Sequence, residues 1–370
     1  MFYGSHHIST AHKGLAAIGC VALIATASAA CGTVQQVGAA VKVKNAVDKL
    51  GEQKAVTATV SFDATEDQVW AAMKGEDDFT KDDAKMLASL HAKLGLSSDK
   101  ALKDSAAAKD AKAAPSDASS FSFQLSSDAA GKQNLIEVRS IGKKVYIRAD
   151  VKALASLGGK DKETSLEGLL PSAEDIPASL GAVKDVLEGK WVSIDPAAFS
   201  DLGKTLGGDK GLGKSPLPDP SSFDAKTQQQ LVDAIRNAME HNAKFTDKGS
   251  DHGVDHVTMT VPGGPAAKEL AKSLAPLEKQ IPDFKAADLN KVPAKDYTVD
   301  LSIKDGMLSG ITVDLTQLNK KPSQGKLPLV IGLDGGSAPV TAPAGARPFT
   351  PQDIMGLFML GAQNLKGLGA

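Results

Sequence analysis

The chain has 370 residues, enough for one large domain or two modest ones, and 42% of them are hydrophobic, which is adequate for a packed core. Its 42 basic and 44 acidic residues give a net charge of −2, so the composition provides no polycationic surface for nucleic acid or anionic lipid headgroups. Aromatic residues make up only 4%, which argues against stacking platforms for sugars or single-stranded nucleic acid.

The N-terminal stretch has the pattern of an export signal. Lys13 precedes the apolar run of residues 15–27, and the small residues Ser28, Ala29 and Ala30 stand directly before Cys31. This order resembles the bacterial lipoprotein signal, in which the cysteine thiol receives a diacylglyceryl group and becomes the new first residue. Two alternatives stay open: cleavage by an ordinary signal peptidase, which gives a soluble secreted protein, and an uncleaved membrane anchor.

The two cysteines, Cys20 and Cys31, both lie in this signal region. The exported part of the chain therefore has no thiol with which to form a disulfide, and its stability must come from packing.

The first half of the chain predicts helices and a run of strands. Apolar residues recur at spacings of three and four in the predicted helices, and they alternate with polar residues in the strands. The stretch of residues 97–120 is rich in Ala, Lys, Asp and Ser and predicts a solvated insertion or loop. In chain order the predicted elements are a helix at 34–50, a strand at 55–62, a helix at 79–95, strands at 121–125, 135–141 and 145–149, a helical or irregular region at 151–188, and a strand at 191–194.

A loop rich in Gly, Pro and Lys, at 202–222, divides the chain, and a similar succession follows it. Asp305 and Gly306 form the turn of the clearest hairpin. The predicted elements are a helix at 224–241, a strand at 257–261, a helix from 265 kinked at Pro276, strands at 297–303 and 311–315, a strand at 327–333, and a last helix after 350. Because hairpins dominate, we expect an antiparallel sheet with helices packed on one face.

Two motifs suggest ligand chemistry. Residues 208–215 match the phosphate-binding pattern G-x-x-x-x-G-K-[ST], but no strand precedes them, and Pro216 and Pro218 forbid the helix that should follow. Residues 251–256, DHGVDH, combine imidazole and carboxylate groups, but no further ligands lie nearby in sequence, so a polar turn that leads into a strand explains them better than a metal site. We therefore expect no metal, no cofactor and no catalytic residue, and we predict that the protein is not an enzyme.

Five stretches resemble the LppX/LprG-type lipoproteins of actinobacteria, which are relatives in fold of the LolA and LolB lipoprotein carriers. The stretches are KAVTATVSF, GKKVYIRAD, GKWVSIDPAAF, YTVDLSIKDGMLSGITVDL and GSAPVTAPAGA. The resemblance implies an α+β fold, a curved antiparallel β half-barrel packed over helices, which encloses an apolar cavity for acyl chains. It predicts a signal peptide at 1–30, a single domain at 31–346 with helical insertions at about 75–120 and 151–188, and a C-terminal helix and tail at 347–370.

The expected function is that of a membrane-anchored extracytoplasmic lipoprotein which binds or carries a lipid or glycolipid without catalysis. Cys31 is the predicted lipidation site and attaches the protein to the cell membrane. The apolar strand residues either line a ligand cavity or form an ordinary packed core, and in the second case the protein is an anchored interaction or envelope-structural protein without a ligand. The candidate lining residues are Val60, Phe62, Phe123, Leu125, Val299, Leu301 and Val313.

Overall fold

A computed structural model of the chain describes residues 34–75, 79–105, 119–128, 133–157, 174, 176–196, 198, 225–278, 284–319 and 325–356. The chain divides into two compact units, which are described in turn. Unit 1 comprises residues 1–52, 109–112 and 220–320, and unit 2 comprises residues 53–108, 113–219 and 321–370. The predicted signal peptide, Cys31 and the motif at 208–215 lie outside the described residues.

Unit 1 is an antiparallel four-stranded sheet with helices packed on it. Its strands lie in the order β10-β9-β8-β7, and helix α2 packs on β7, β9 and β10 while α10 and α11 contact β8. The elements are α2 (Val34–Gly51), α10 (Ala225–Asn242), β7 (Lys244–Asp251), β8 (Val254–Pro262), α11 (Gly263–Leu274), α12 (Ala286–Leu289), β9 (Asp296–Lys304) and β10 (Met307–Asp314), with 3-10 turns η6 (Ala275–Leu277) and η7 (Leu315–Leu318).

The strands of unit 1 bury most of one face. The β8–β9 register places Val257 opposite Leu301 and Met259 opposite Val299, and Ile311 of β10 lies opposite Leu301. Side chains buried in this core include Val43, Ala234, Ala238, Phe245, Val257, Met259, Ala271, Leu274, Leu301, Ile303, Leu308 and Ile311. Unit 1 therefore has a filled hydrophobic core.

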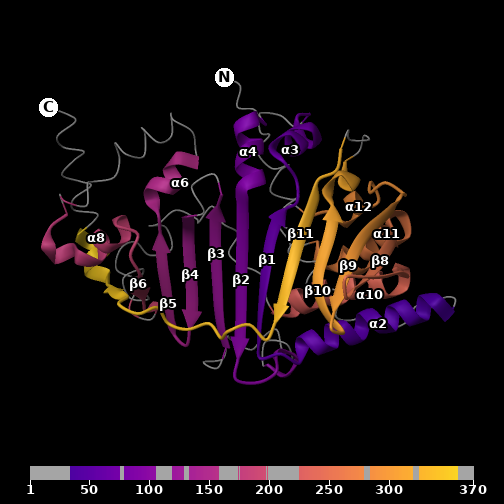
Figure 1. Cartoon of the computed structure of the whole chain (residues 1–370), viewed down its shortest axis with the longest axis horizontal. Helices are drawn as coiled ribbons and strands as arrows, with labels where there is room; N and C mark the ends of the chain where they lie inside the picture. The colour runs from indigo at the N-terminus through magenta and orange to yellow at the C-terminus, as the bar shows by residue number, and fades with distance from the viewer. Residues whose placement is uncertain are drawn as a thin grey trace. The chain divides into compact units, whose positions relative to one another are not determined.

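Unit 2 holds eight strands in the order β12-β6-β5-β4-β3-β2-β1-β11, side by side in Figure 1. Its pairings are antiparallel except that β12 runs parallel to β6. The elements are β1 (Ala55–Phe62), α3 (Glu66–Met73), α4 (Lys81–Ser89), β2 (Leu90–Ser98), η2 (Leu102–Asp104), β3 (Ser119–Ser127), β4 (Gln133–Ile141), β5 (Lys144–Ala149), α6 (Val151–Leu157), η3 (Ala178–Leu180), α8 (Gly181–Leu187), β6 (Val192–Ile194), β11 (Pro328–Gly335) and β12 (Arg347–Phe349).

The predicted helix at 79–95 is wrong in its second half. Thr80 caps helix α4 as predicted, with Asp83 completing the capping box, but the helix ends at Ser89 and Leu90 begins strand β2. Leu90 and Leu94 fit both a helical stripe and one face of a strand, and pairing with β1 on one side and β3 on the other selects the strand.

The sequence analysis missed several short or edge elements, α3, α12, β7 and β12 among them. Helix α3 begins with a capping box formed by Thr65 and Gln68, strand β7 lies at an edge of the unit 1 sheet, and β12 is only three residues long. The other predicted helices and strands are found within a few residues of their expected ranges, and residues 351–356 are helical. The predicted class, α+β with an antiparallel sheet and helices packed on it, is confirmed.

Candidate functional site

One face of the unit 2 sheet is predominantly apolar on β1 to β6 and β11, although Ser127, Ser140 and Arg347 of β12 also lie on it. Residues that share this face are fixed by the register: Val56 pairs with Leu96, Leu96 pairs with Phe121, and Val138 pairs with both Phe123 and Ile147. We use the name apolar face for its apolar side chains, which are Val56, Ala58, Val60, Phe62, Leu90, Ala92, Leu94, Leu96, Phe121, Phe123, Leu125, Ile136, Val138, Val145, Ile147, Ala149, Val192, Ile194, Leu329, Ile331 and Leu333.

Burial of this face changes from its margins to its middle. Ile331 and Leu333 of β11 and Val192 of β6 are buried. On β1 to β5, by contrast, every residue of the apolar face is only half-buried or exposed. Leu96 is 45% exposed to solvent and Phe121 is 38% exposed. These two residues are cross-strand partners at one end of the sheet. The apolar face is thus most open along the row that contains Val56, Leu96 and Phe121.

The seven predicted lining residues are divided between the two units. Val60, Phe62, Phe123 and Leu125 lie on the apolar face of unit 2, where each is half-buried. Val299, Leu301 and Val313 lie in unit 1; Leu301 is completely buried, and the other two are half-buried.

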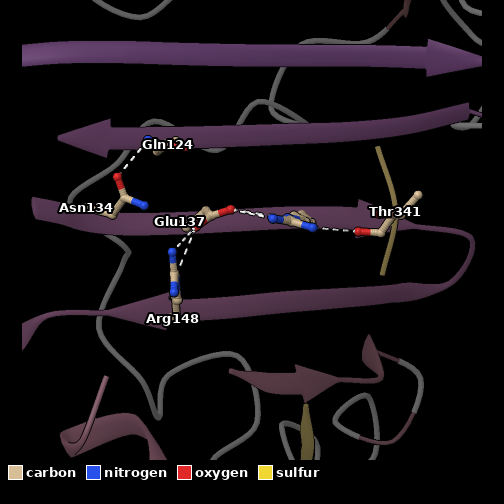
Figure 2. Close-up of polar contacts among 6 residues, drawn as sticks. Gln124, Asn134, Glu137, Arg148 and Thr341 are labelled. Atoms are coloured by element: carbon tan, nitrogen blue, oxygen red, sulfur yellow. Dashed lines mark hydrogen bonds and ion pairs between the residues drawn. The ribbon is translucent and has the colours of Figure 1, made fainter. Parts of the chain in front are cut away.

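The opposite face of the unit 2 sheet, which we call the polar face, carries a charge cluster built on Glu137 (Figure 2). Glu137 of β4 is 5% exposed. Its Oε1 accepts hydrogen bonds from Arg139 Nε at 3.3 Å and Nη2 at 2.7 Å, and its Oε2 accepts from Arg148 Nε at 3.0 Å and lies 2.7 Å from Arg148 Nη2. Two guanidinium groups therefore clamp a single carboxylate, which leaves one net positive charge.

Trp191 completes the cluster. The guanidinium carbon of Arg139 lies 4.9 Å from the centre of the indole and that of Arg148 lies 5.2 Å from it, which is cation–π range. Trp191 immediately precedes β6, and the β5–β6 register places Tyr146 opposite Ser193, so the indole falls on the polar face. The cluster ties β4, β5 and the start of β6 together.

Residues 337–346, here called the crossing segment, run from β11 across the unit 2 strands to β12 (yellow in Figure 1). Thr57 Oγ1 and Ser337 Oγ are 3.0 Å apart, Val340 N donates to Ser97 Oγ at 3.1 Å, and Arg139 Nη1 donates to Thr341 O at 2.8 Å. The segment approaches the sheet so closely that a Cβ at Gly95 would lie 3.3 Å from Val340 Cγ2 and 2.4 Å from Ser122 Oγ.

A polar cavity of about 490 Å³ lies where β4 begins and β5 ends. Its wall is made by Asn134, Arg148, Asp150, Lys152, Leu187, Glu188 and Gly189. In Figure 2 Asn134 is held by Gln124, whose Nε2 donates to Asn134 Oδ1 at 2.7 Å. Asp150 Oδ1 accepts a hydrogen bond from Ala153 N at 2.9 Å and thereby caps α6.

The charged groups of residues 251–256 serve the β7–β8 hairpin and its packing. His252 lies in the turn with φ 47°, and its side chain is 94% exposed. Lys42 of α2 pairs with Asp247 at 2.8 Å and with Asp255 at 3.4 Å. The hydrogen bond from Lys42 lowers the pKa of Asp247, and the hydrogen bond from Ser250 lowers that of Asp255. Within the described ranges, no group of three or more His, Cys, Asp or Glu is placed to hold a metal ion.

Over the same described ranges, none of the helices is both long and apolar enough to cross a membrane.

Comparison with solved structures finds mycobacterial lipoproteins among its matches. The crystal structure of Mycobacterium tuberculosis lipoprotein LppX matches over 82% of this chain and 97% of its own, with 11% identity and a TM-score of 0.30. The structure of LprF from Mycobacterium bovis matches over 84% of this chain and 97% of its own, with 12% identity and a TM-score of 0.30. Both are of the LppX/LprG type, the group that the sequence motifs resemble. No protein-family model and no curated protein matches the chain.

Sequence reasoning missed the Glu137 cluster and the cavity. The signal that could have found the cluster is the β4–β5 hairpin: its turn at Gly142 and Lys143 places Glu137 opposite Arg148, and alternation brings Arg139 to the same face. Trp191 and the cavity come from parts of the chain whose position only the fold determines.

Proposed function

We propose that the protein is a lipoprotein, anchored through Cys31 at the extracytoplasmic face of the cell membrane, whose apolar face in unit 2 binds the acyl chains of a lipid. The observation that carries the proposal is the incomplete burial of that face on β1 to β5, in contrast to the largely buried sheet face of unit 1.

The energetics favour an apolar occupant. Burying a whole Leu or Phe side chain contributes roughly 1.5–3 kcal/mol, so covering its remaining half contributes about 1 kcal/mol. Large side chains that are half-buried on the apolar face are Phe62, Leu94, Phe123 and Leu125. Leu96 and Phe121 are more exposed still. An acyl chain can follow such a surface because it needs bulk apolar contact and few polar groups.

Native mass spectrometry of the purified full chain tests the proposal, with organic extraction of the bound material. We expect co-purified lipid in the wild type and loss of at least about four-fifths of it in Leu96→Glu and Phe121→Glu, since a carboxylate on the apolar face has no partner there. The matched control is Val41→Glu on α2, whose parent side chain is 48% exposed and lies in unit 1. A lipid-free wild type, or equal loss in the control, would show that the apolar face is not a lipid site.

The anchor is tested separately by Cys31→Ala. We expect the variant to leave the membrane fraction and to incorporate no radiolabelled fatty acid, because the thiol is the atom that is acylated. A variant that stays in the membrane fraction, together with an unacylated mature N-terminus in the wild type, would overturn this part of the proposal.

A further inference from the structure

The polar cavity at the end of β4 and β5 contains two opposite charges that do not neutralise each other. Asp150 makes its hydrogen bond to a backbone N–H, and neither it nor Lys152 forms an ion pair with any group in the described part of the chain. The two residues are two apart in sequence and line the same cavity, yet they are not paired with each other. Among the described residues, each of these two charges is left without a counter-charge.

The remaining charged groups of the wall already form ion pairs, although their charges still act on a ligand in the cavity. Arg148 directs Nε and Nη2 to Glu137, and Glu188 pairs with Lys190 at 2.5 Å. Asn134 uses its carbonyl oxygen to accept from Gln124, so its amide N–H groups are directed elsewhere. The wall thus offers one unpaired cation, one unpaired anion and an amide donor.

Charge complementarity then selects the ligand. A simple anion in this cavity faces Asp150 and Glu188, and a simple cation faces Arg148 and Lys152, so each meets a repelling charge as well as an attracting one. A zwitterion can place its acidic group against Lys152 and its ammonium group against Asp150. The volume of 490 Å³ lies within the roughly 300–1,000 Å³ that small-molecule sites occupy.

We propose that this cavity binds a zwitterion that carries a primary ammonium group and a phosphate or carboxylate group, with Asp150 and Lys152 as the two charged contacts. Such chemistry has two sources, a free amino compound and the headgroup of an aminophospholipid. The site is on residues separate from the apolar face, so it stands whether or not that face binds lipid.

Calorimetric titration of the full chain with O-phosphoethanolamine tests the site. We expect saturable binding, and we expect ethanolamine and inorganic phosphate, which carry only one half of the ligand each, to bind at least about tenfold more weakly. Equal binding of the three compounds, or no binding of O-phosphoethanolamine, would overturn the proposal.

Two variants identify the contacts. Asp150→Asn removes the negative charge but keeps an oxygen that can cap α6, and Lys152→Gln removes the positive charge at an exposed position; each should weaken O-phosphoethanolamine binding about tenfold. The matched controls are Asp334→Asn and Lys143→Gln, which remove the same charges at exposed positions of unit 2 away from the cavity. If the controls weaken binding as much as the cavity variants do, the effect comes from net charge and the assignment to the cavity is wrong.

Vesicles separate the two sources. Co-sedimentation of the Cys31→Ala chain, which has no lipid anchor, with phosphatidylethanolamine vesicles assigns the ligand to a lipid headgroup if it is lost when Lys152→Gln is added and is absent with phosphatidylglycerol vesicles. Binding of soluble O-phosphoethanolamine without such co-sedimentation assigns it to a free amino compound. Either result supports the cavity as the binding site. A negative result in both assays overturns the cavity proposal but does not bear on the lipid extraction experiment, which tests the apolar face.

Discussion

Replacement of Glu137 by Gln should destabilise unit 2 strongly. The change keeps the shape of the side chain but removes the one negative charge that two guanidinium groups share at 2.7 Å each. Removing one partner of a buried ion pair costs about 3–5 kcal/mol, because an uncompensated charge is left behind. The side chains of Arg139 and Arg148 are 26% and 35% exposed, so water relieves part of the cost. We therefore expect about 3 kcal/mol, the lower end of that range.

Urea unfolding followed by the fluorescence of Trp191 measures this effect where it arises, because the guanidinium carbons of Arg139 and Arg148 lie 4.9 Å and 5.2 Å from the centre of the indole. A Trp70→Phe background makes Trp191 the sole tryptophan. With a slope of roughly 2 kcal/mol per molar urea, the loss corresponds to a midpoint lower by about 1.5 M. Adding Arg148→Gln should recover part of it, since only one guanidinium then remains without a counter-charge.

Asp128→Asn is the control. Asp128 pairs with His91 at 3.1 Å on the surface of the same unit, with side chains 53% and 43% exposed, and such a pair contributes about 0–1 kcal/mol. A Glu137→Gln shift no larger than that of Asp128→Asn would refute the reasoning and show that the arginines are as well satisfied by water as by the carboxylate.

Three further outcomes follow from the geometry. Gly95→Ala should cost about 1–3 kcal/mol in urea unfolding, because its Cβ would meet Ser122 Oγ at 2.4 Å, and Ser122→Gly should restore much of the loss. The hydrogen bond from Lys42 lowers the pKa of Asp247, so the stability that this carboxylate contributes is complete above the ordinary pKa of 3.8 and is lost as the pH falls below it. The difference in the free energy of unfolding between pH 5 and pH 3 should therefore be smaller in Lys42→Gln than in the wild type. An unchanged difference would show that the Lys42–Asp247 pair is not its source. Leu301→Ala, at a completely buried position, should lower the free energy of unfolding of unit 1 by about 2–5 kcal/mol; a cost below 1 kcal/mol would mean that the core around it is loose.

Most of the local structure could be predicted from the sequence. Alternating residues in 55–62 and 297–303, and the turn at Asp305 and Gly306, produce the observed strands and hairpin because the pattern itself decides which side chains share a face. The prediction was wrong at Leu90, because Leu90 and Leu94 fit both the helical period and the strand period. It also failed at β7, whose alternation contains one buried apolar residue, Phe245. An edge strand of that kind needs little apolar surface.

The candidate site also has a part that the sequence predicted and a part that only the fold determined. Alternation alone placed Val60, Phe62, Phe123 and Leu125 on one face of their strands, whereas the lipidation predicted at Cys31 rests on a local pattern and stays a prediction. Whether an apolar face is covered depends on helices elsewhere in the chain, and the contacts that assemble unit 2 join residues as distant as Thr57 and Ser337, which are 280 positions apart. The sequence thus determined the faces, since they follow from local period, whereas only the tertiary structure decided which face is filled, where the arginines meet Glu137 and where a cavity remains, because these depend on long-range packing.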